Sequence, residues 1–390
     1  MVGGGEGAFI GAVHRMAAAL DGKIELACGA FSRNFANSLS TGTVLGLSED
    51  RCYQDIQSML TCESEPNKNN SVLGSAMEML AIVTPNHTHV PIAISAAEAG
   101  FHIMSDKPAG VSLAEVEELA STLLSTGVHY GLTHTYLGYP MVWQARHLSA
   151  QPEFGPIRKV LVNYTQGWLA SETESTGSKQ AEWRVDPERS GPAGALGDIG
   201  SHAHSLAEFI TNSRMTRLSA SLRSHYPSRA LDDDGEIGFS LENGASGQLI
   251  SSQICTGDEN ELTIRIYGQH ASLEWRQMEP NTLTERRASG QSITHRAGVD
   301  KPLCEEALNR CRLPSGHPEG YIEAFANLYS RFARALRDGV KPSTMGVPGI
   351  AEALRGMAFL EAAIASNVAN GAWHEIKAPS VGPDLKGLLS

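Results

Sequence analysis

Three side chains have the types that removing a proton from a substrate hydroxyl requires: His202, Lys107 and Asp198. A histidine titrates near neutral pH and can act as the general base. A lysine beside the oxygen stabilises the developing alkoxide and lowers the pKa of the histidine. Asp198 precedes His202 by four residues, so on a helix its carboxylate could orient the ring or contact the hydroxyl. The set suits oxidation of a secondary alcohol, in which a hydride leaves the carbon that bears the hydroxyl.

Lys107 follows a short apolar strand in "FHIMSDKPAG", residues 101–110. Ligands of a doubly wound sheet sit at the carboxyl ends of its strands, so we expect this strand to be a rigid mount for Lys107. Gly200, between Asp198 and His202, allows a ligand to approach the backbone closely. Taken singly, Lys107 also fits an ordinary solvated lysine, and Asp198 also fits a helix N-cap.

A glycine-rich run, "MVGGGEGAFIGAVHR", lies between the remnant of a strand and a helix. In that context a loop can hold a pyrophosphate at the helix N-terminus. Two registers remain open: Gly3, Gly5 and Gly11, or Gly3 and Gly5 with Ala8 in third place. The strand consists of residues 1–2 alone, which indicates either a natural start further upstream or a short edge of the sheet.

The end of the second predicted strand decides between the two nicotinamide cofactors, since an acid there binds ribose hydroxyls and an arginine accommodates a 2′-phosphate. Ser32 and Arg33 stand at this point, with no acid. They favour NADP, or use of both cofactors, slightly over NAD. Stacking of Arg33 on an adenine, or exposure to solvent, is the alternative.

The first third of the chain alternates between helical and strand patterns, which predicts a parallel sheet with helices on both faces. The predicted strands are 24–31, 77–85, 101–106 and 128–136, and the predicted helices are 8–20, 49–60, 89–100, 112–127 (with Ser112 as N-cap) and 139–149.

After residue 150 longer alternating strands predict an antiparallel sheet, with a hairpin at Glu242-Asn243-Gly244. The polar stretch 277–316 is predicted to be a long excursion, either a lid or an oligomer arm, and two helices end the chain. The predicted fold is α/β plus α+β. Residues 1–138 form a Rossmann domain that binds NAD(P), and residues 139–390 form a substrate-binding and oligomerisation domain whose last helices can pack back on the first.

Composition sets the broad class. The chain has 390 residues, 41% of them hydrophobic, and a net charge of −12 without a basic block, so we expect no nucleic acid or anionic membrane as partner. No apolar run is long enough for a membrane span and no leader peptide is evident, which predicts a cytoplasmic protein. The six cysteines have no metal-ligand or disulfide spacing, so we expect reduced thiols and no metal.

Two segments carry a resemblance to a known family. "AIVTPNHTHVPIAISAAEAGFHIMSDKPAG" and "EWRVDPERSGPAGALGDIGSHAHSLAEF" resemble the glucose-fructose oxidoreductase, inositol dehydrogenase and rhizopine-catabolism (Gfo/Idh/MocA) family, in which a TPNxxH segment precedes an acid-Lys-Pro tripeptide. Asp106 stands where glutamate is usual. Residues 191–194 depart from the usual glycine triplet, whereas the acid and the histidine that follow match the family's pattern.

The resemblance implies a Rossmann domain, an open antiparallel sheet and hydride transfer between a sugar or polyol hydroxyl and nicotinamide C4. It implies Lys107, Asp198 and His202 as catalytic residues, and a cis Lys107-Pro108 bond. His89 is included in the cofactor set, although its position favours capping or packing as its role. The implied cofactor set is Gly3, Gly5, Phe9, Ile10, Gly11, Ser32, Arg33, Thr84, Pro85, Asn86, His89, Asp106 and Lys107.

The substrate set is expected at strand ends and beside the second segment, where aromatic rings can stack on a sugar and amide or guanidinium groups can bind its hydroxyls. For each tryptophan, ordinary core packing is an equal alternative. His204, two positions from His202, is expected to be structural. The set is Lys107, Tyr136, Gln166, Trp168, Trp183, Arg184, Asp198 and His202.

The main functional prediction is an NAD(P)-dependent dehydrogenase of a sugar, inositol or glycoside. A glycosidase of the same fold, which uses bound NAD for a transient oxidation, is one alternative, and a non-catalytic ligand sensor is another. An exposed apolar sheet face in the second domain would need to be covered, which predicts a homodimer or homotetramer.

Overall fold

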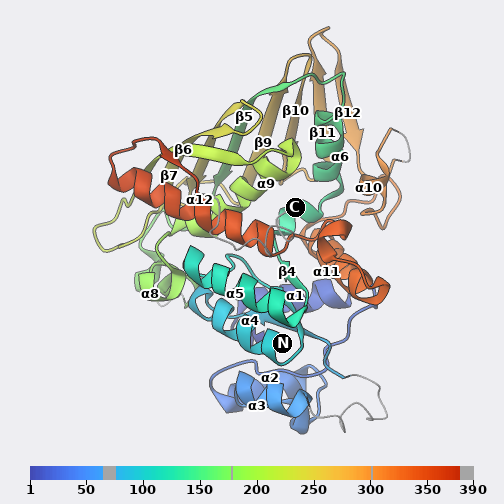
Figure 1. Cartoon of the computed structure of the whole chain (residues 1–390), viewed down its shortest axis with the longest axis vertical. Coiled ribbons are helices and arrows are strands. Elements are labelled where there is room, and N and C mark those ends of the chain that lie inside the picture. Colours follow the sequence, from blue (N-terminus) through green and yellow to red (C-terminus); the bar gives the residue numbers. More distant parts are fainter. Residues whose placement is uncertain (65–75, 177–178, 300–301, 378–390) are drawn as a thin grey trace. The chain divides into compact units, whose positions relative to one another are not determined.

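The computed structural model describes residues 1–64, 76–176, 179–299 and 302–377 (Figure 1). The chain divides into two compact units. The first comprises residues 1–133 and 325–354, and the second comprises residues 134–324 with 355–377. Each unit has its own sheet, and the two sheets are built differently.

The first unit contains a parallel four-stranded sheet in the order β1-β2-β3-β4, which agrees with the predicted Rossmann fold. Its strands are short and almost wholly buried, as expected for a sheet covered on both faces. The strands are β1 (Val2–Gly3), β2 (Met79–Val83), β3 (His102–Ser105) and β4 (Tyr130–Leu132), and the helices are α1 (Phe9–Ala19), α2 (Phe35–Val44), α3 (Ile56–Glu63), α4 (His89–Glu98) and α5 (Leu113–Thr126).

The prediction of a strand at residues 24–31 is wrong. Only two isolated bridges form there, Val2 with Ala30 and Gly29 with Cys52. Because β1 has two residues, the segment beside it can pair over no greater length. The helix predicted at 49–60 is also displaced, since a short 3-10 turn (Glu49–Arg51) comes first and Asp55 caps α3 by accepting from the Ser58 amide.

Two other boundaries follow from local capping. The predicted N-cap Ser112 is confirmed, because its side chain accepts from the Glu115 amide at the start of α5. Helix α2 was not predicted from the sequence; Asn34 caps it by accepting from the Asn37 amide. The strand predicted to run to residue 136 ends at Leu132, and a 3-10 helix (Thr135–Gly138) follows it.

The second unit contains a nine-stranded sheet in the order β12-β11-β10-β9-β5-β8-β7-β6-β13. All neighbours are antiparallel except β5 and β8, which run parallel. The strands are β5 (Ile157–Thr165), β6 (Met215–Arg223), β7 (Asp234–Leu241), β8 (Ser246–Ser252), β9 (Glu261–Gly268), β10 (Ala271–Arg276), β11 (Thr282–Arg287), β12 (Ser292–Arg296) and β13 (His374–Glu375).

One face of this sheet holds the core. Helix α9 (Ser201–Thr211) packs on β5, β8 and β9, and helix α6 (Pro140–Ser149) packs on β10 and β11 (Figure 1). Along β5, Val160 and Val162 are buried, whereas Lys159 and Asn163, which alternate with them, are exposed. The opposite face is therefore of mixed polarity, and the expectation that it would be apolar is wrong.

The stretch 277–316 is not the irregular excursion that its polarity predicted. It contains the hairpin of β11 and β12, which extends the sheet, and helix α10 (Glu305–Leu308). The polar residues fit because they pair with one another: buried His295 lies 2.9 Å from Glu285, which also binds Arg287 at 2.7 Å. The alternation of polar and apolar residues that is typical of a strand could not be recognised in the sequence, because the buried face of this hairpin carries charged groups.

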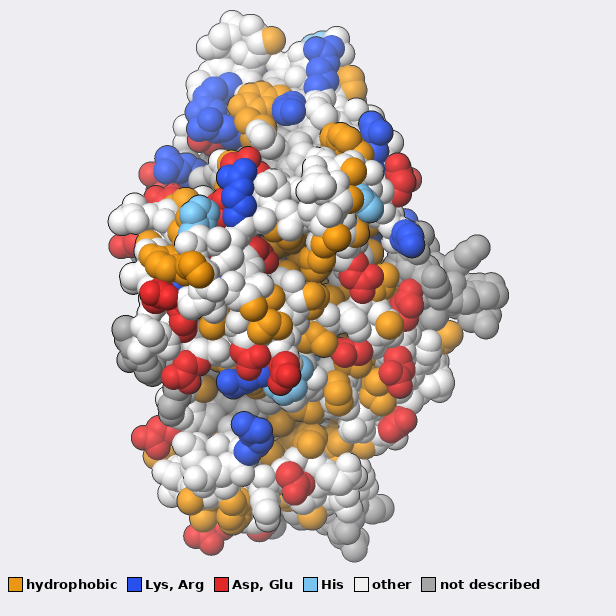
Figure 2. All heavy atoms as spheres, turned by 90° about the vertical axis from the view of Figure 1, so that its left-hand side faces the viewer, with side chains coloured by type: hydrophobic (Ala, Val, Ile, Leu, Met, Phe, Trp, Pro, Cys, Tyr) orange, Lys and Arg blue, Asp and Glu red, His pale blue; other side chains and the backbone are white. Residues whose placement is uncertain are grey.

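The two predicted C-terminal helices are confirmed as α11 (Tyr321–Asp338) and α12 (Ile350–Val368). Within the part of the chain that the structure describes, no helix has the length and apolarity needed to cross a membrane. On the side of the molecule drawn in Figure 2, lysine and arginine side chains lie mostly in the upper part of the view, and acidic side chains lie mostly in its middle and lower parts.

Candidate functional site

The glycine loop of the first unit brings the backbone of a strand end against that of α1. Gly3 and Gly4 have φ of +79° and +75°, and a Cβ on Gly11 would lie 2.3 Å from the Cα of Gly4. No side chain caps the helix at Ala8. Uncapped amides at a helix start, reached by a glycine loop, suit a pyrophosphate. Of the two residues considered for the third position, Gly11 rather than Ala8 is thus the one that packs on the loop. Gly4 was not among the glycines predicted to form the loop.

The adenosine end of the predicted cofactor site contains Ser32 and Arg33. The Ser32 hydroxyl accepts from the Asn34 amide at 3.1 Å, and the Arg33 side chain is exposed. Gly5 donates its backbone N–H to Phe31 at 3.0 Å, so this segment lies directly beside the glycine loop. Of the neighbouring predicted residues, Phe9 is 64% exposed and Ile10 is partly buried.

The segment after β2 joins two parts of the first unit through His89. The buried ring contacts the carbonyl of Thr84 through Nε2 and that of Pro108 through Nδ1, both at 2.7 Å. Burial lowers the pKa of His89, although nearby Asp106 and the two carbonyls favour the charged form. His89 thus packs between strand ends, the alternative role considered for it. Pro85 is the N-cap residue of the short 3-10 helix Asn86–Thr88, in which Asn86 is buried.

Lys107 begins the turn that follows β3, and the expected cis bond to Pro108 is confirmed. Its neighbour Asp106 accepts from the Lys107 backbone N–H at 2.9 Å and from the Thr133 hydroxyl at 3.0 Å. Buried His14, which the sequence analysis missed, places Nε2 3.9 Å from the Asp106 carboxylate, an electrostatic contact rather than a hydrogen bond. Burial alone would raise the pKa of Asp106, but His14, Lys107 and His89 hold it well below its usual range.

In the second unit, strand register brings three amide side chains together. Gln166 and Gln253 follow β5 and β8, which are parallel and end in register at Thr165 and Ser252. Asn260 precedes β9, whose first residue pairs with Thr165. Gln166 consequently donates to Asn260 at 2.8 Å and accepts from Gln253 at 3.2 Å.

Gln166, Gln253 and Asn260 thus form a hydrogen-bonded amide array, and two tyrosines extend it. The hydroxyls of Tyr136 and Tyr164 contact each other, Tyr164 donates to Asn260 Oδ1 at 2.6 Å, and Asn260 donates to Tyr136 at 3.2 Å. Burial raises the pKa of both tyrosines, so neither is ionised near neutral pH. They serve as hydrogen-bonding groups rather than as bases.

His202 lies among aromatic rings on α9. Its ring is 4.8 Å from that of Tyr136, 5.5 Å from that of His134 and 6.2 Å from that of Tyr164. Its side chain is 6% exposed. His204, by contrast, stacks on Phe359 at 4.4 Å and lies 3.4 Å from Glu208, which agrees with the structural role expected for it.

Asp198 lies on a π-helical turn, η6 (Leu196–Gly200), directly before α9. Such turns are uncommon and occur frequently at functional sites. The carboxylate Oδ2 accepts from Gln253 at 2.9 Å and from Arg184 at 3.3 Å. The amide array therefore continues from the tyrosines to Asp198.

Arg184, at the end of α7 (Lys179–Arg184), also contacts the predicted tryptophans. Its guanidinium carbon is 4.3 Å from the ring centre of Trp183 and 6.0 Å from that of Trp168. The Trp168 indole donates to Gln166 Oε1 at 2.9 Å. Within the second unit, the structure thus brings together every substrate-set residue predicted there: Tyr136, Gln166, Trp168, Trp183, Arg184, Asp198 and His202.

Several members of this array were not predicted from the sequence. Tyr164 had a local signal, because it lies two positions before Gln166 and so shares its face of the strand pattern. Gln253 and Asn260 had none, since only the pairing of β5 with β8 and β9 places them beside Gln166. Among the described residues, no group of three or more potential metal ligands is present.

Comparison with family models covers most of the chain. Residues 1–134 match an oxidoreductase family with an NAD-binding Rossmann fold, and residues 142–274 match the GFO/IDH/MocA C-terminal domain. An uncharacterised oxidoreductase of Bacillus subtilis (strain 168) is 32% identical over 386 residues, which cover 97% of this chain and 96% of that protein.

Two further proteins are similar. An inositol dehydrogenase homologue from Azotobacter vinelandii, solved with NAD+, has a TM-score of 0.90 at 33% identity over 96% of both chains. Its complex with NADH and myo-inositol has a TM-score of 0.86 at the same identity and coverage. A levoglucosan dehydrogenase of Pseudarthrobacter phenanthrenivorans is 26% identical over 239 residues, 55% of this chain and 60% of that protein.

Proposed function

We propose, since this chain belongs to the Gfo/Idh/MocA oxidoreductase family, that it oxidises a secondary hydroxyl of a cyclic polyol or sugar and uses NAD as cofactor. The observation that carries the proposal is the continuous array of Tyr136, Asn260, Gln166, Gln253 and Asp198. Such a row offers alternating donors and acceptors, which suit a ligand with several hydroxyls. The aromatic rings beside it can pack on the C–H face of a ring.

Each catalytic role follows from a residue's chemistry. His202 takes the proton of the hydroxyl, and its aromatic surroundings limit access of water. Lys107 supplies positive charge to the developing alkoxide. Asp198, which Gln253 and Arg184 hold in place, binds a hydroxyl of the substrate. Bound nicotinamide supplies the hydride acceptor.

The glycine loop, the uncapped start of α1 and the turn after β2 support the proposal of residues 1–138 as the cofactor-binding domain. The amide array supports residues 139–390 as the substrate-binding domain, although its member Tyr136 lies just before that boundary. The Azotobacter vinelandii homologue was solved with NAD+ and with NADH, which favours NAD. The lean toward NADP from Ser32 and Arg33 has no comparable support. We keep the cytoplasm as the proposed location.

We keep a homodimer or homotetramer as the proposed assembly, with the open face of the nine-stranded sheet as its interface. Lys159, Asn163 and Arg265 alternate with buried residues there, so a second copy would bind this face through hydrogen bonds and ion pairs rather than by covering an apolar surface. The molar mass of the purified protein, measured by light scattering, tests this assembly. A monomer at all protein concentrations would exclude it.

The catalytic roles are tested with His202→Ala and Lys107→Met. The matched control is Lys341→Met, which makes the same change at an exposed lysine. We expect both site variants to lose at least about a hundredfold in turnover with myo-inositol or another accepted polyol. NADH affinity, measured by fluorescence, should stay within a few-fold. Comparable losses of cofactor affinity and turnover would refute the assignment.

A further inference from the structure

The connection between β6 and β7, residues 224–233, contains charged groups that are nearly inaccessible to solvent. Arg229 is 6% exposed and Asp233 is fully buried. Their side chains lie 3.0 Å apart. Burying charge is costly unless every hydrogen-bonding group is satisfied, so such a cluster needs a reason in the fold.

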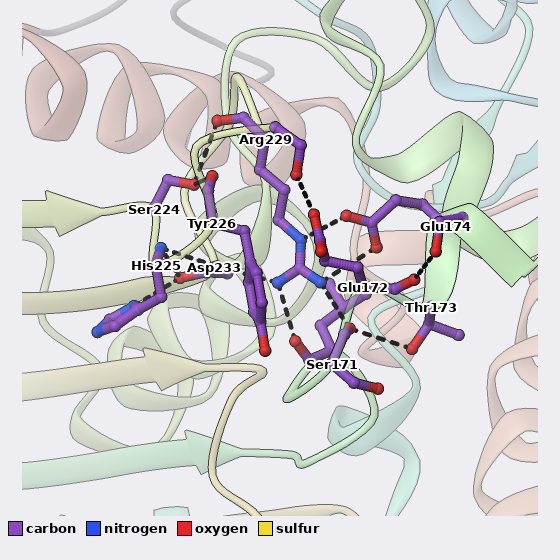
Figure 3. Close-up of polar contacts among 12 residues, drawn as sticks. Ser171, Glu172, Thr173, Glu174, Ser224, His225, Tyr226, Arg229 and Asp233 are labelled. Atoms are coloured by element: carbon purple, nitrogen blue, oxygen red, sulfur yellow. Dashed lines mark hydrogen bonds and ion pairs between the residues drawn. The ribbon is translucent and has the colours of Figure 1, made fainter.

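The Arg229 guanidinium binds one neighbouring segment with most of its five N–H groups (Figure 3). It donates to the Leu169 carbonyl at 2.8 Å, to the Ser171 carbonyl at 2.7 Å, and to both carboxylate oxygens of Glu174 at 2.8 and 3.1 Å. The remaining bond goes to Asp233 at 3.0 Å. Segment 169–174 is thus tied to the connection through its main chain as well as a side chain.

Further contacts join the same two segments. The Tyr226 hydroxyl donates to the Ala170 carbonyl at 2.6 Å, and the Ser228 hydroxyl donates to Glu172 at 2.6 Å. Asp233 in turn accepts from the His225 backbone N–H and ring (Figure 3). Arg229 therefore lies at the centre of these contacts, between segment 169–174 and the rest of residues 224–233.

Segment 169–174 begins directly after Trp168, which contacts Gln166 and Arg184. The Leu169 amide also donates to the Gln253 carbonyl at 3.0 Å. A shift of this segment would move the indole away from the amide array. The side-chain hydrogen bonds of Arg229 go to Leu169, Ser171, Glu174 and Asp233 rather than to the array, yet they hold the segment that directly follows Trp168.

The same connection holds the turn that carries Asp198. The Asp232 carboxylate accepts from the amides of Gly194 at 2.7 Å and Leu196 at 2.8 Å, and its carbonyl accepts from Ala195 at 2.8 Å. Gly194 and Ala195 precede the π-helical turn, and Leu196 is its first residue. A cavity of about 10 Å³ separates the two anchored segments, and Leu169, Arg184, Asp198, Arg229, Asp232 and Gln253 are among its lining residues.

We propose that residues 224–233 are a positioning brace for the substrate site, in which Arg229 sets the place of Trp168 and Asp232 sets the place of Asp198. The proposal rests on the proposed function, because it takes Trp168 and Asp198 to contact the polyol. Loosening of the Trp168 segment weakens substrate binding and so raises KM. Loosening of the Asp198 turn misplaces a group needed during reaction and so lowers kcat.

The test combines kinetics with hydrogen exchange on the full chain, for Arg229→Met, Asp232→Asn and the control Arg334→Met, which removes an exposed arginine of α11. We expect R229M to raise the polyol KM about tenfold with the NAD KM unchanged, and D232N to lower kcat about tenfold. Amides 169–174 should exchange faster in R229M only, and those of 194–198 in D232N only. If R229M does not fold, Glu174→Gln removes one of its partners more gently.

Unchanged exchange in both segments would overturn the brace, whatever the kinetics. Faster exchange with unchanged KM and kcat would overturn the positioning role while the proposed function stands. A wild-type protein that oxidises no polyol would refute the proposed function, and with it the positioning role. The exchange data would still report whether residues 224–233 hold the two segments.

Discussion

The side-chain amide of Gln253 donates a hydrogen bond of 2.9 Å to Oδ2 of Asp198. The same amide nitrogen lies 3.2 Å from Gln166 Oε1, so one buried side chain links the acid to the wall of the proposed substrate site. Since the partner strands β5 and β8 are parallel, this link depends on the topology of the sheet rather than on a local motif.

Replacing Gln253 with leucine should therefore disturb turnover more than folding. The variant keeps a similar volume but leaves Asp198 with one donor fewer, and we expect kcat to fall about tenfold with the NAD KM unchanged. Steady-state kinetics of Q253L against Q248L provides the check, because Gln248 is exposed on β8, the strand that Gln253 directly follows. Equal kinetics in the two variants would show that the link has no role.

His89→Asn should lower both stability and turnover. Asparagine is too short to reach the carbonyls of Thr84 and Pro108 together, so at least one buried acceptor loses its partner, at a cost of about 1–3 kcal/mol. We expect a lower melting temperature and a lower kcat, because the turn that carries Lys107 is anchored there. His317→Asn, at an exposed position, is the control. Destabilisation without any kinetic effect would separate His89 from the placement of Lys107.

Arg33→Ala tests the cofactor preference. A 2′-phosphate would lose a cationic partner, whereas the NAD ribose has no charge to lose, so we expect the KM for NADP to rise at least about fivefold and that for NAD to change less than twofold. Initial rates with each cofactor measure both values. A larger effect on NAD would mean that Arg33 supports the adenine ring or the ribose instead.

Glu208 gives a prediction for the stability of the second unit at low pH. Its carboxylate binds Arg355 at 2.9 Å and the Met215 amide at 2.7 Å, and it lies 3.4 Å from His204. Burial favours the neutral acid, but these partners lower the pKa of Glu208 to about 2.

Because the folded pKa is depressed, the stabilisation is fully present above the unfolded pKa of about 4.3 and is lost as the pH falls toward 2. The loss should reach about 3 kcal/mol in the free energy of unfolding. Denaturant titrations of wild type and Glu208→Gln should differ at neutral pH and converge in acid. A difference that stays constant with pH would contradict the assignment.

Much of this account could be predicted from local patterns. Short apolar strands alternating with helices indicated the parallel sheet, and the segments around Lys107 and Asp198 indicated the family, which the comparisons confirm. Failures occurred where tertiary pairing overrides local pattern. Residues 24–31 have strand character but a neighbour only two residues long, and the β11–β12 hairpin hides its alternation behind the buried pair of Glu285 and His295.

The proposed site divides in the same way. Residues in sequence motifs, such as Asp198 and Arg184, could be predicted. Gln253, Asn260 and Arg229 could not, because only the order of strands and the length of the β6–β7 connection bring them to the array.

Hydride transfer from a polyol or sugar to NAD is the proposed activity on which all the roles above depend. The most direct measurement is the near-ultraviolet absorbance of reduced nicotinamide when purified protein meets inositols, aldoses, anhydrosugars and glycosides, with NAD and NADP in separate wells. We expect growth of this absorbance with at least one polyol or sugar, faster with NAD than with NADP, and its loss in His202→Ala. No growth with any of them, from protein that binds NADH, would contradict it and would favour a redox glycosidase or a ligand sensor instead.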